Sequence, residues 1–249
     1  MRVWVVNDRQ TCIEGSRTLW HLLTETLPDA TFIGGDYLTL AQTVSEMPGV
    51  PDVLVRPASY FGPIAKDCPT ISLVQEIHPQ GPTRDMLVNV CRGSSLVVFN
   101  TEFTRSHYPE LADLPYRVIP IGVDSELFKP TPTDWSEKGM IAWVGAPYYV
   151  KGWDIFLAIA NEMKAFPFVV VTKAAIATVP ANVHVFESVS HKDLPALLSS
   201  CSMLLCTSRV ETQHLAGIEA GLCGLPVVSS RVGIYADLPP GPWGNIVPF

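Results

Sequence analysis

The sequence VETQHLAGIEAGLCGLPVVSS, which runs from Val210 to Ser230, predicts a helix between two strands. The strand-like run SMLLCTS precedes the helix, and the run LPVVSS follows it. We expect the helix to begin near Gln213 or His214 and to end at Gly224, where Gly-Leu-Pro breaks the helical pattern. Such a helix packs on a sheet with its N-terminus at the carboxyl edge of the strands, where open α/β sheets bind ligands. The stretch therefore predicts an α/β fold with a ligand site at the start of this helix.

Two acidic residues, Glu211 and Glu219, lie in this stretch at a spacing of eight positions. Glu211 is expected in the loop before the helix and Glu219 inside it. The unpaired N–H groups of the first turn attract an anion, so a diphosphate could rest there with a sugar at Glu211 and a ribose at Glu219. Alternatively, the acids complement the helix dipole, and Glu219 is a solvated helix residue. The predicted position at a strand edge favours the binding site.

The rest of the chain repeats the pattern of strand, helix and strand that is typical of parallel sheets. A polar segment with two prolines, DSELFKPTPTDWSEKG (124–139), interrupts the pattern and predicts a linker. We therefore expect two sheet domains, 1–123 and 140–249, with a cleft between them. Helices are predicted at 16–27, 152–166 and 192–200, and strands at 1–6, 30–35, 51–57, 70–77, 95–100, 117–122, 140–146, 167–173, 183–186, 203–208 and 226–230.

The composition is that of a folded globular protein, with 249 residues, 47% hydrophobic and 16% charged. The net charge of −7 argues against a broad surface for nucleic acid. No 18-residue apolar run is present, and the start MRVWVVND resembles a strand rather than a signal peptide. We therefore expect a soluble, cytoplasmic protein without a transmembrane segment.

Cysteine and histidine spacing gives no sign of a metal site. The six cysteines form no C-x-x-C pair and lie mostly in apolar segments, which favours buried thiols over disulfides or zinc ligands. Walker A, G-x-S-x-G and G-x-G-x-x-G sequences are absent, which argues against a nucleotide hydrolase, a serine hydrolase and a dinucleotide enzyme. A single glycine, in Glu14-Gly15, is a weak sign of a glycine-rich turn after the first strand.

Three cations lie near predicted strand ends. Lys151 follows a strand and a short loop, where it could hold a phosphate as a point charge. The alternative is a solvated lysine, but a cation at a helix start is unfavourable, which favours the functional role. Lys173 follows the strand 167–173 and Arg209 precedes Glu211 by two positions, so each is either a second phosphate contact or a surface residue.

Two histidines have equally open assignments. His78, in QEIHPQG, ends a strand of the first domain and could orient an acceptor hydroxyl or the transferred sugar. It could equally be a loop residue that makes a structural hydrogen bond. His214 could contact phosphate at the helix start, or it could cap or pack against the helix.

Five segments in order resemble the retaining GT-B glycosyltransferases of family four, also called glycosyl transferases group 1, in a compact form. The resemblance covers about 97–247 and is weaker before that. This family includes bacterial mannosyltransferases and sucrose-phosphate synthases. The segments are VVFNTEFTRSHY (97–108), VIPIGVDSELFKP (118–130), VKGWDIFLAIA (150–160), VSHKDLPALLSSCSMLLCTSRVE (189–211) and the glutamate stretch.

The resemblance implies two Rossmann-like domains, an N-terminal one on the acceptor side and a C-terminal one that binds a UDP-, GDP- or ADP-sugar without a metal or cofactor. It also implies that Glu211 contacts the sugar hydroxyls, Glu219 the ribose and Lys151 the leaving diphosphate. His78 loosely matches a histidine near the reacting sugar. The predicted catalytic residues are thus Lys151, Glu211 and His78, and the predicted nucleotide-sugar contacts are Glu219, Lys173, His214, Leu215 and Gly145.

The chain departs from the family pattern in three places. The family usually has an arginine five residues before the lysine, where this chain has Ala146. The glycines that usually follow the first glutamate are replaced by Thr212, Gln213 and His214. The given sequence ends at Phe249, whereas the family normally continues into helices that cross back to the first domain.

Two functions therefore compete. The first is a transferase that moves a sugar to an acceptor hydroxyl with retention, while the departing phosphate takes the acceptor proton. The second is a non-catalytic nucleotide-sugar-binding protein or partner subunit, which the departures favour. The acceptor is left open among a sugar, a lipid, a protein and a nucleic acid, and the acidic charge disfavours the last.

Overall fold

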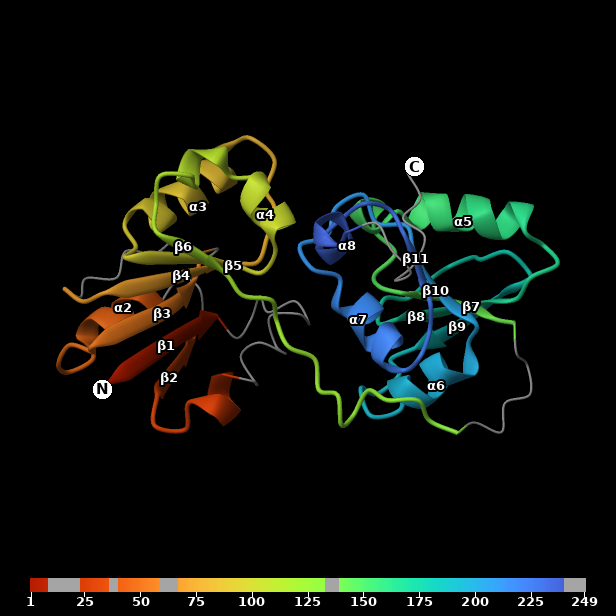
Figure 1. Ribbon diagram of the computed structural model, residues 1–249, viewed down its shortest axis with the longest axis horizontal. Coiled ribbons are helices and arrows are strands. Elements are labelled where there is room, and N and C mark those ends of the chain that lie inside the picture. The colour runs from red at the N-terminus through yellow and green to blue at the C-terminus, as the bar shows by residue number, and fades with distance from the viewer. Residues whose placement is uncertain (9–22, 36–39, 59–66, 133–138, 240–249) are drawn as a thin grey trace. The chain divides into compact units, whose positions relative to one another are not determined.

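The computed structural model describes residues 1–8, 23–35, 40–58, 67–132 and 139–239 (Figure 1). The chain divides into two compact units, Met1–Gly122 and Val123–Phe249. Each unit is built on one sheet whose paired strands are all parallel. The expected α/β fold with two Rossmann-like domains is thus confirmed.

The first unit contains a six-stranded sheet in the order β2-β1-β3-β4-β5-β6. This order is that of a doubly wound sheet of the flavodoxin type, extended by one strand. Its strands are β1 (Val3–Asp8), β2 (Thr31–Gly35), β3 (Val53–Pro57), β4 (Thr70–Val74), β5 (Leu96–Phe99) and β6 (Tyr116–Val118). In the described part of this unit, residues 23–26 are helical and the further helices are α2 (Leu40–Glu46), α3 (Pro82–Arg92), α4 (Glu102–Ser106) and the 3-10 helix η1 (Pro109–Leu111).

The second unit contains a five-stranded sheet in the order β11-β10-β7-β8-β9. Counted from the first strand of the unit, this is the Rossmann order 3-2-1-4-5 seen from its other edge. The strands are β7 (Ile141–Val144), β8 (Phe168–Thr172), β9 (Val183–Glu187), β10 (Met203–Cys206) and β11 (Val227–Ser229). The helices are η2 (Tyr149–Lys151), α5 (Trp153–Glu162), α6 (Leu194–Ser200), α7 (Leu215–Leu222) and α8 (Ile234–Asp237).

Strand β8 shows how this sheet is covered on both faces. All five of its residues are buried, and alternate side chains belong to different cores. Phe168 and Val170 pack with Phe156 of α5, whereas Val169 and Val171 pack on the other side, in the core that α6 and α7 share. Figure 1 shows α5 on one face of the sheet and α6 and α7 on the opposite face. This arrangement brings the loops after β7 and β10 out at the same carboxyl edge.

The described part of the expected linker belongs structurally to the second unit. Phe128 is fully buried in the same core as Leu198 and Leu204. Residues 133–138 lie outside the described ranges. The domain boundaries expected at 123 and 139 stay a prediction.

Most expected elements are present, with shifted ends. The sequence did not predict α2, α3, α4 or α8, nor the 3-10 helices η1 and η2. Residues 23–26 of the helix expected at 16–27 are helical, and the remainder up to residue 22 lies outside the described part, as do Glu14 and Gly15. Within the described ranges, no helix is both long and apolar enough to span a membrane.

Candidate functional site

The second sheet reverses its strand order between β7 and β10, which are neighbours although about 60 residues separate them. Ligands of Rossmann-type sheets bind in the crevice outside such a switch point. The two loops that leave this point are joined directly. The N–H of Arg209 donates to the carbonyl of Val150 over 2.9 Å, and the Thr207 hydroxyl donates to the carbonyl of Lys151 over 3.1 Å. The site therefore begins with two loops fixed to each other.

Lys151 and Glu211 meet across this junction. The Lys151 ammonium donates to Oε1 of Glu211 over 2.7 Å, and the Ser208 hydroxyl donates to the same oxygen over 2.7 Å. Glu211 is only 8% exposed, whereas 34% of the Lys151 side chain is exposed. Burial acts to raise the pKa of Glu211, but the charges of His214 and Lys151 and the two hydrogen bonds lower it below its usual value. Glu211 is thus an ionised acceptor beside an ammonium that solvent reaches.

The start of α7 is shaped by the backbone of His214. This residue has φ 68° and ψ 67°, a left-handed conformation that is uncommon outside glycine. Its side chain makes no capping hydrogen bond; instead Nδ1 lies 3.1 Å from the Tyr235 hydroxyl in a buried contact. Of the two alternatives for this residue, the ring packs against Tyr235, while a contact with phosphate stays a prediction.

His214 is also electrostatically linked to Cys206, at the end of β10. Burial acts to lower the pKa of His214, but Cys206 and Glu211 raise it above its usual value. Burial acts to raise the pKa of Cys206, but His214 lowers it. Each of these two groups thus shifts the pKa of the other toward its charged form, and His214 also acts to lower the pKa of Glu211.

Glu219 is buried on α7, in contrast to the solvated alternative. Its Oε1 lies 3.4 Å from Nε2 of His191, whose ring contacts Phe128 edge-on at 4.9 Å between centroids. Burial raises the pKa of Glu219, although the charges of His191 and His214 act to lower it. The two glutamates thus differ: Glu211 is held ionised, and Glu219 is a buried carboxyl more easily protonated than usual.

The other predicted contacts lie at the same edge of the sheet. Gly145 follows β7, and its N–H donates to the carbonyl of Val171 over 3.0 Å. Lys173 follows β8, the neighbour of β7, and is exposed. Leu215 is the first residue of α7 and is half-buried. Their assignment to the nucleotide-sugar stays a prediction.

Arg209 is engaged by protein groups rather than held open for an anion. Its guanidinium makes two bonds to the Asp154 carboxylate, at 2.7 and 2.8 Å, and one to the Tyr149 carbonyl at 2.8 Å. Its Cζ lies 3.8 Å from the centre of the Tyr149 ring. The structure therefore does not support the second-cation alternative for Arg209.

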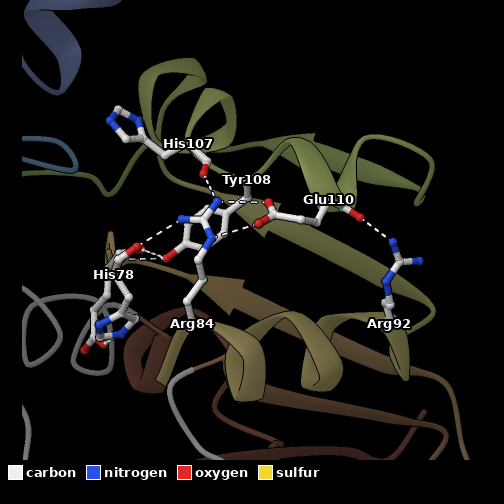
Figure 2. A network of polar contacts seen from close by, with 7 residues as sticks. His78, Arg84, Arg92, His107, Tyr108 and Glu110 are labelled. Atoms are coloured by element: carbon white, nitrogen blue, oxygen red, sulfur yellow. Dashed lines mark hydrogen bonds and ion pairs between the residues drawn. The ribbon is translucent and has the colours of Figure 1, made fainter. Parts of the chain in front are cut away.

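His78 belongs to the first unit, in the loop after β4. Nε2 of its ring lies 2.8 Å from the Glu76 carboxylate. Its N–H donates to the Tyr108 hydroxyl over 3.1 Å, and its carbonyl accepts from Arg84 over 3.0 Å (Figure 2). The backbone of His78 therefore makes structural hydrogen bonds, and its ring pairs with a neighbouring acid.

A buried arginine organises this network. Arg84 bonds both oxygens of Glu110 at 2.9 Å, donates to the carbonyl of His107, and lies over the Tyr108 ring with Cζ 4.5 Å from its centre (Figure 2). The hydrogen bond from Arg84 is the main cause that lowers the pKa of Glu110 to about 2. The sequence analysis missed Arg84 and Glu110, because their positions 26 residues apart gave no local pattern.

Five of the six cysteines lie in the described ranges. There, Cys91, Cys206 and Cys223 are buried thiols, as expected, while Cys12 lies outside. No three His, Cys, Asp or Glu side chains of those ranges gather closely enough to hold a metal ion.

Comparison with known proteins shows similarity to glycosyltransferases. The family model "Glycosyl transferases group 1" matches residues 138–248. Comparison with curated protein sequences gives no match. Sucrose-phosphate synthase from Thermosynechococcus elongatus is similar at 12% identity with a TM-score of 0.75, and the match covers 99% of this chain and 86% of that chain. Trehalose-6-phosphate synthase is similar at 12% identity with a TM-score of 0.73, over 95% of this chain and 86% of that chain. A TarM mutant from S. aureus, in complex with UDP among other ligands, is similar at 15% identity with a TM-score of 0.68, over 85% of this chain and 48% of that chain; these identities show the fold alone.

The family match covers nearly all of the second unit, including the Lys151–Glu211 pair and α7. The structural matches extend over both units. Residues 138–248 of this chain are therefore a domain of the glycosyl transferases group 1 family, in a protein with the two-domain GT-B fold of glycosyltransferases.

Proposed function

We propose that the protein transfers a sugar from a nucleotide-diphosphate sugar to an acceptor hydroxyl. The observation that carries this proposal is the Lys151–Glu211 pair at the switch point of the second sheet, 2.7 Å apart. A buried carboxylate and a partly exposed ammonium suit the two ends of a sugar phosphate. Glu211 accepts hydrogen bonds from sugar hydroxyls, and Lys151 meets the phosphate.

The diphosphate lies, in this proposal, between Lys151 and the start of α7. The first turn of α7 leaves backbone N–H groups unpaired within the helix, and the helix dipole favours an anion there. The ribose reaches Glu219 further along the same helix. Leu215, Gly145 and Lys173 surround the nucleotide from the neighbouring loops.

The chemistry places positive charge where negative charge grows. When the bond between the sugar and phosphate breaks, the sugar becomes cation-like and the diphosphate gains charge. Fixed donors aimed at that phosphate lower the barrier because they need no reorganisation. Lys151 and the N-terminus of α7 supply such donors without a metal, so we propose metal-independent transfer without a cofactor.

Retention and the donor base are further parts of the proposal. The solved trehalose-6-phosphate synthase is described as transferring with retention, which supports the same stereochemistry here. TarM from S. aureus binds UDP, which makes a uridine donor the first to test, before GDP- and ADP-sugars. The acceptor remains a sugar, a lipid, a protein or a nucleic acid, and we propose a cytoplasmic location.

Ala146 favours the second candidate, a non-catalytic nucleotide-sugar-binding protein. It stands where the resemblance leads one to expect an arginine, and its methyl side chain carries no charge to the phosphate. The loss of one stabilising group typically lowers a rate by about 100- to 1000-fold. Such a protein would bind the donor and not turn it over.

Calorimetry and product release separate the two candidates. The protein is titrated with UDP-, GDP- and ADP-sugars, and release of the nucleoside diphosphate is followed with sugar, lipid and protein acceptors. A transferase binds the nucleotide-sugar and releases a nucleoside diphosphate, whereas the non-catalytic protein binds the nucleotide-sugar without releasing a product. Glu219→Ala should abolish binding in both cases, with Glu162→Ala, an exposed acid at the C-terminal end of helix α5, as the control. If the wild type binds none of the donors, both candidates fail.

A further inference from the structure

The turn that carries Lys151 is held by side chains with no assigned role in the reaction. Residues Tyr149–Lys151 form η2, between β7 and α5. Arg209, from the loop after β10, bonds the Tyr149 carbonyl through its side chain and the Val150 carbonyl through its backbone. Its guanidinium is in turn held in place by Asp154, in the first turn of α5. The turn is thus fixed from both the loop after β10 and helix α5.

A second set of contacts fixes the end of the same turn. The indole N–H of buried Trp143 donates to the Thr207 hydroxyl over 3.0 Å, and that hydroxyl donates to the carbonyl of Lys151 over 3.1 Å. Gly152 has φ 65°, and a Cβ there would lie 1.9 Å from the Thr207 carbonyl oxygen. Because the backbones approach this closely, Lys151 has little freedom to move along the sheet edge.

We propose that Arg209 and Asp154 are positioning residues that act through Lys151, by fixing the turn from which its ammonium reaches the donor phosphate. This inference rests on the proposed function. The Lys151 side chain is long and flexible, so its position depends on a fixed backbone. The guanidinium of Arg209 uses its N–H donors for Asp154 and Tyr149, and the Asp154 carboxylate neutralises its charge. Arg209 is therefore suited to hold the turn rather than to contact the phosphate.

The ion pair itself adds little to stability, because exposed pairs contribute little on their own. The bidentate contact between Arg209 and Asp154 instead orders the turn, because two parallel hydrogen bonds from one guanidinium fix its orientation as well as its distance. Loss of the pair should therefore impair the phosphate contact more than it impairs folding.

Asp154 gives the sharpest test, because the two explanations predict opposite signs. If charge alone mattered, Asp154→Ala would remove a negative group near an anion site and tighten UDP binding. If Asp154 holds Arg209 in place, the same substitution loosens the turn and weakens UDP binding by about tenfold, the loss of one charge-assisted hydrogen bond. Calorimetry with UDP measures this, and tighter or unchanged binding would overturn the proposal.

A double-mutant cycle tests whether Arg209 acts through Lys151. Arg209→Ala and Lys151→Ala should each weaken UDP binding by about tenfold, and the double variant should be no weaker than Lys151→Ala alone. Arg209→Lys keeps the charge and loses the fork, so it should not restore binding. Additive losses would show that Arg209 contacts the phosphate itself. Arg105→Ala is the matched control, since Arg105 also pairs with an acid, Glu102, and lies over a tyrosine.

Hydrogen exchange tests the positioning role without any ligand. The N–H groups of Lys151 and Gly152 donate to the carbonyls of Tyr148 and Tyr149, both over 3.0 Å. These amides should exchange about tenfold faster in Arg209→Ala and Asp154→Ala than in the wild type, while the amides of β8 keep their protection. Unchanged exchange at η2 overturns the positioning role. If the wild type binds no nucleotide, the proposed function fails, and the exchange result still decides this inference.

Discussion

Replacement of Lys151 by alanine should affect the reaction more than the binding of the donor. The substitution removes the ammonium that lies 2.7 Å from Glu211 and leaves a carboxylate that is only 8% exposed. In the ligand-free protein, Ser208 still donates to that carboxylate and His214 still acts to lower its pKa, so we expect the variant to fold. During transfer the loss of the ammonium costs more than during donor binding, since charge on the leaving diphosphate grows toward the transition state.

The expected magnitudes follow from this difference. Loss of one charge-assisted hydrogen bond to a bound phosphate weakens donor affinity by about tenfold, or about 1.4 kcal/mol. Loss of a fixed donor to the developing charge lowers kcat by about 100- to 1000-fold, or about 2.7 to 4 kcal/mol. The turnover number should therefore fall about ten times more than the affinity, or further.

The assay combines nucleotide release with calorimetry, using a donor that the wild type turns over. Lys164→Ala is the matched control, because this exposed lysine lies just before β8, at the opposite edge of the sheet. Lys151→Arg should retain part of the affinity and less of the rate, because the planar fork cannot follow Glu211 and the phosphate as a compact ammonium does. Equal losses in affinity and turnover would refute the reasoning and leave Lys151 as a binding residue only.

Two further predictions concern stability. Gly217→Ala should destabilise the second unit by about 1 to 3 kcal/mol, because a Cβ there would lie 1.7 Å from the Tyr235 hydroxyl and 2.5 Å from Nδ1 of His214. Thermal unfolding measures this loss. Gly221→Ala is the control: a Cβ there meets nothing within 4 Å, so this variant should be neutral or slightly stabilised. Glu110 should make unfolding pH-dependent: its pKa falls from 4.5 to about 2 in the folded state, so its contribution is present above pH 4.5 and is lost as the pH falls toward 2. Denaturant titrations from pH 2 to 6 should show the free energy of unfolding fall toward low pH, and Glu110→Gln should make this fall smaller. The same pH dependence in Glu110→Gln as in the wild type would contradict the prediction.

The fold was largely predictable because hydrophobic patterns act locally. Strand β8, FVVVT, is buried on both faces, and a continuous run of β-branched residues is typical of such a strand. The helices that the sequence analysis missed have weaker signals. Helix α4 is only five residues long and depends on Thr101, whose side chain accepts from the N–H of Thr104. Helix α3 begins at Pro82, directly after a glycine, and its first turn reads as a turn sequence.

The sequence correctly placed the glutamate stretch at the carboxyl edge of a strand. It did not show which side chains contact these glutamates. Lys151 and Glu211 are 60 positions apart, and they meet because β10 pairs with β7 rather than with β9. The sequence left Arg209 open as a second phosphate contact or a surface residue, and the structure pairs it with the carboxylate of Asp154, 55 positions away. Periodicity and motif spacing report short-range order, whereas these contacts depend on strand order.

The distribution of positive charge at this edge explains why Lys151 should matter so much. Ala146 brings no charge, and the charge of Arg209 is neutralised by Asp154. The ring of His214 is buried and contacts the Tyr235 hydroxyl. Lys151 is exposed enough to contact a phosphate while it stays bonded to Glu211, because an ammonium has three N–H donors, and the N–H groups of α7 are further fixed partners. The rate then depends on where the backbone of Lys151 is held, so loss of the Arg209–Asp154 pair should lower turnover as well as UDP affinity.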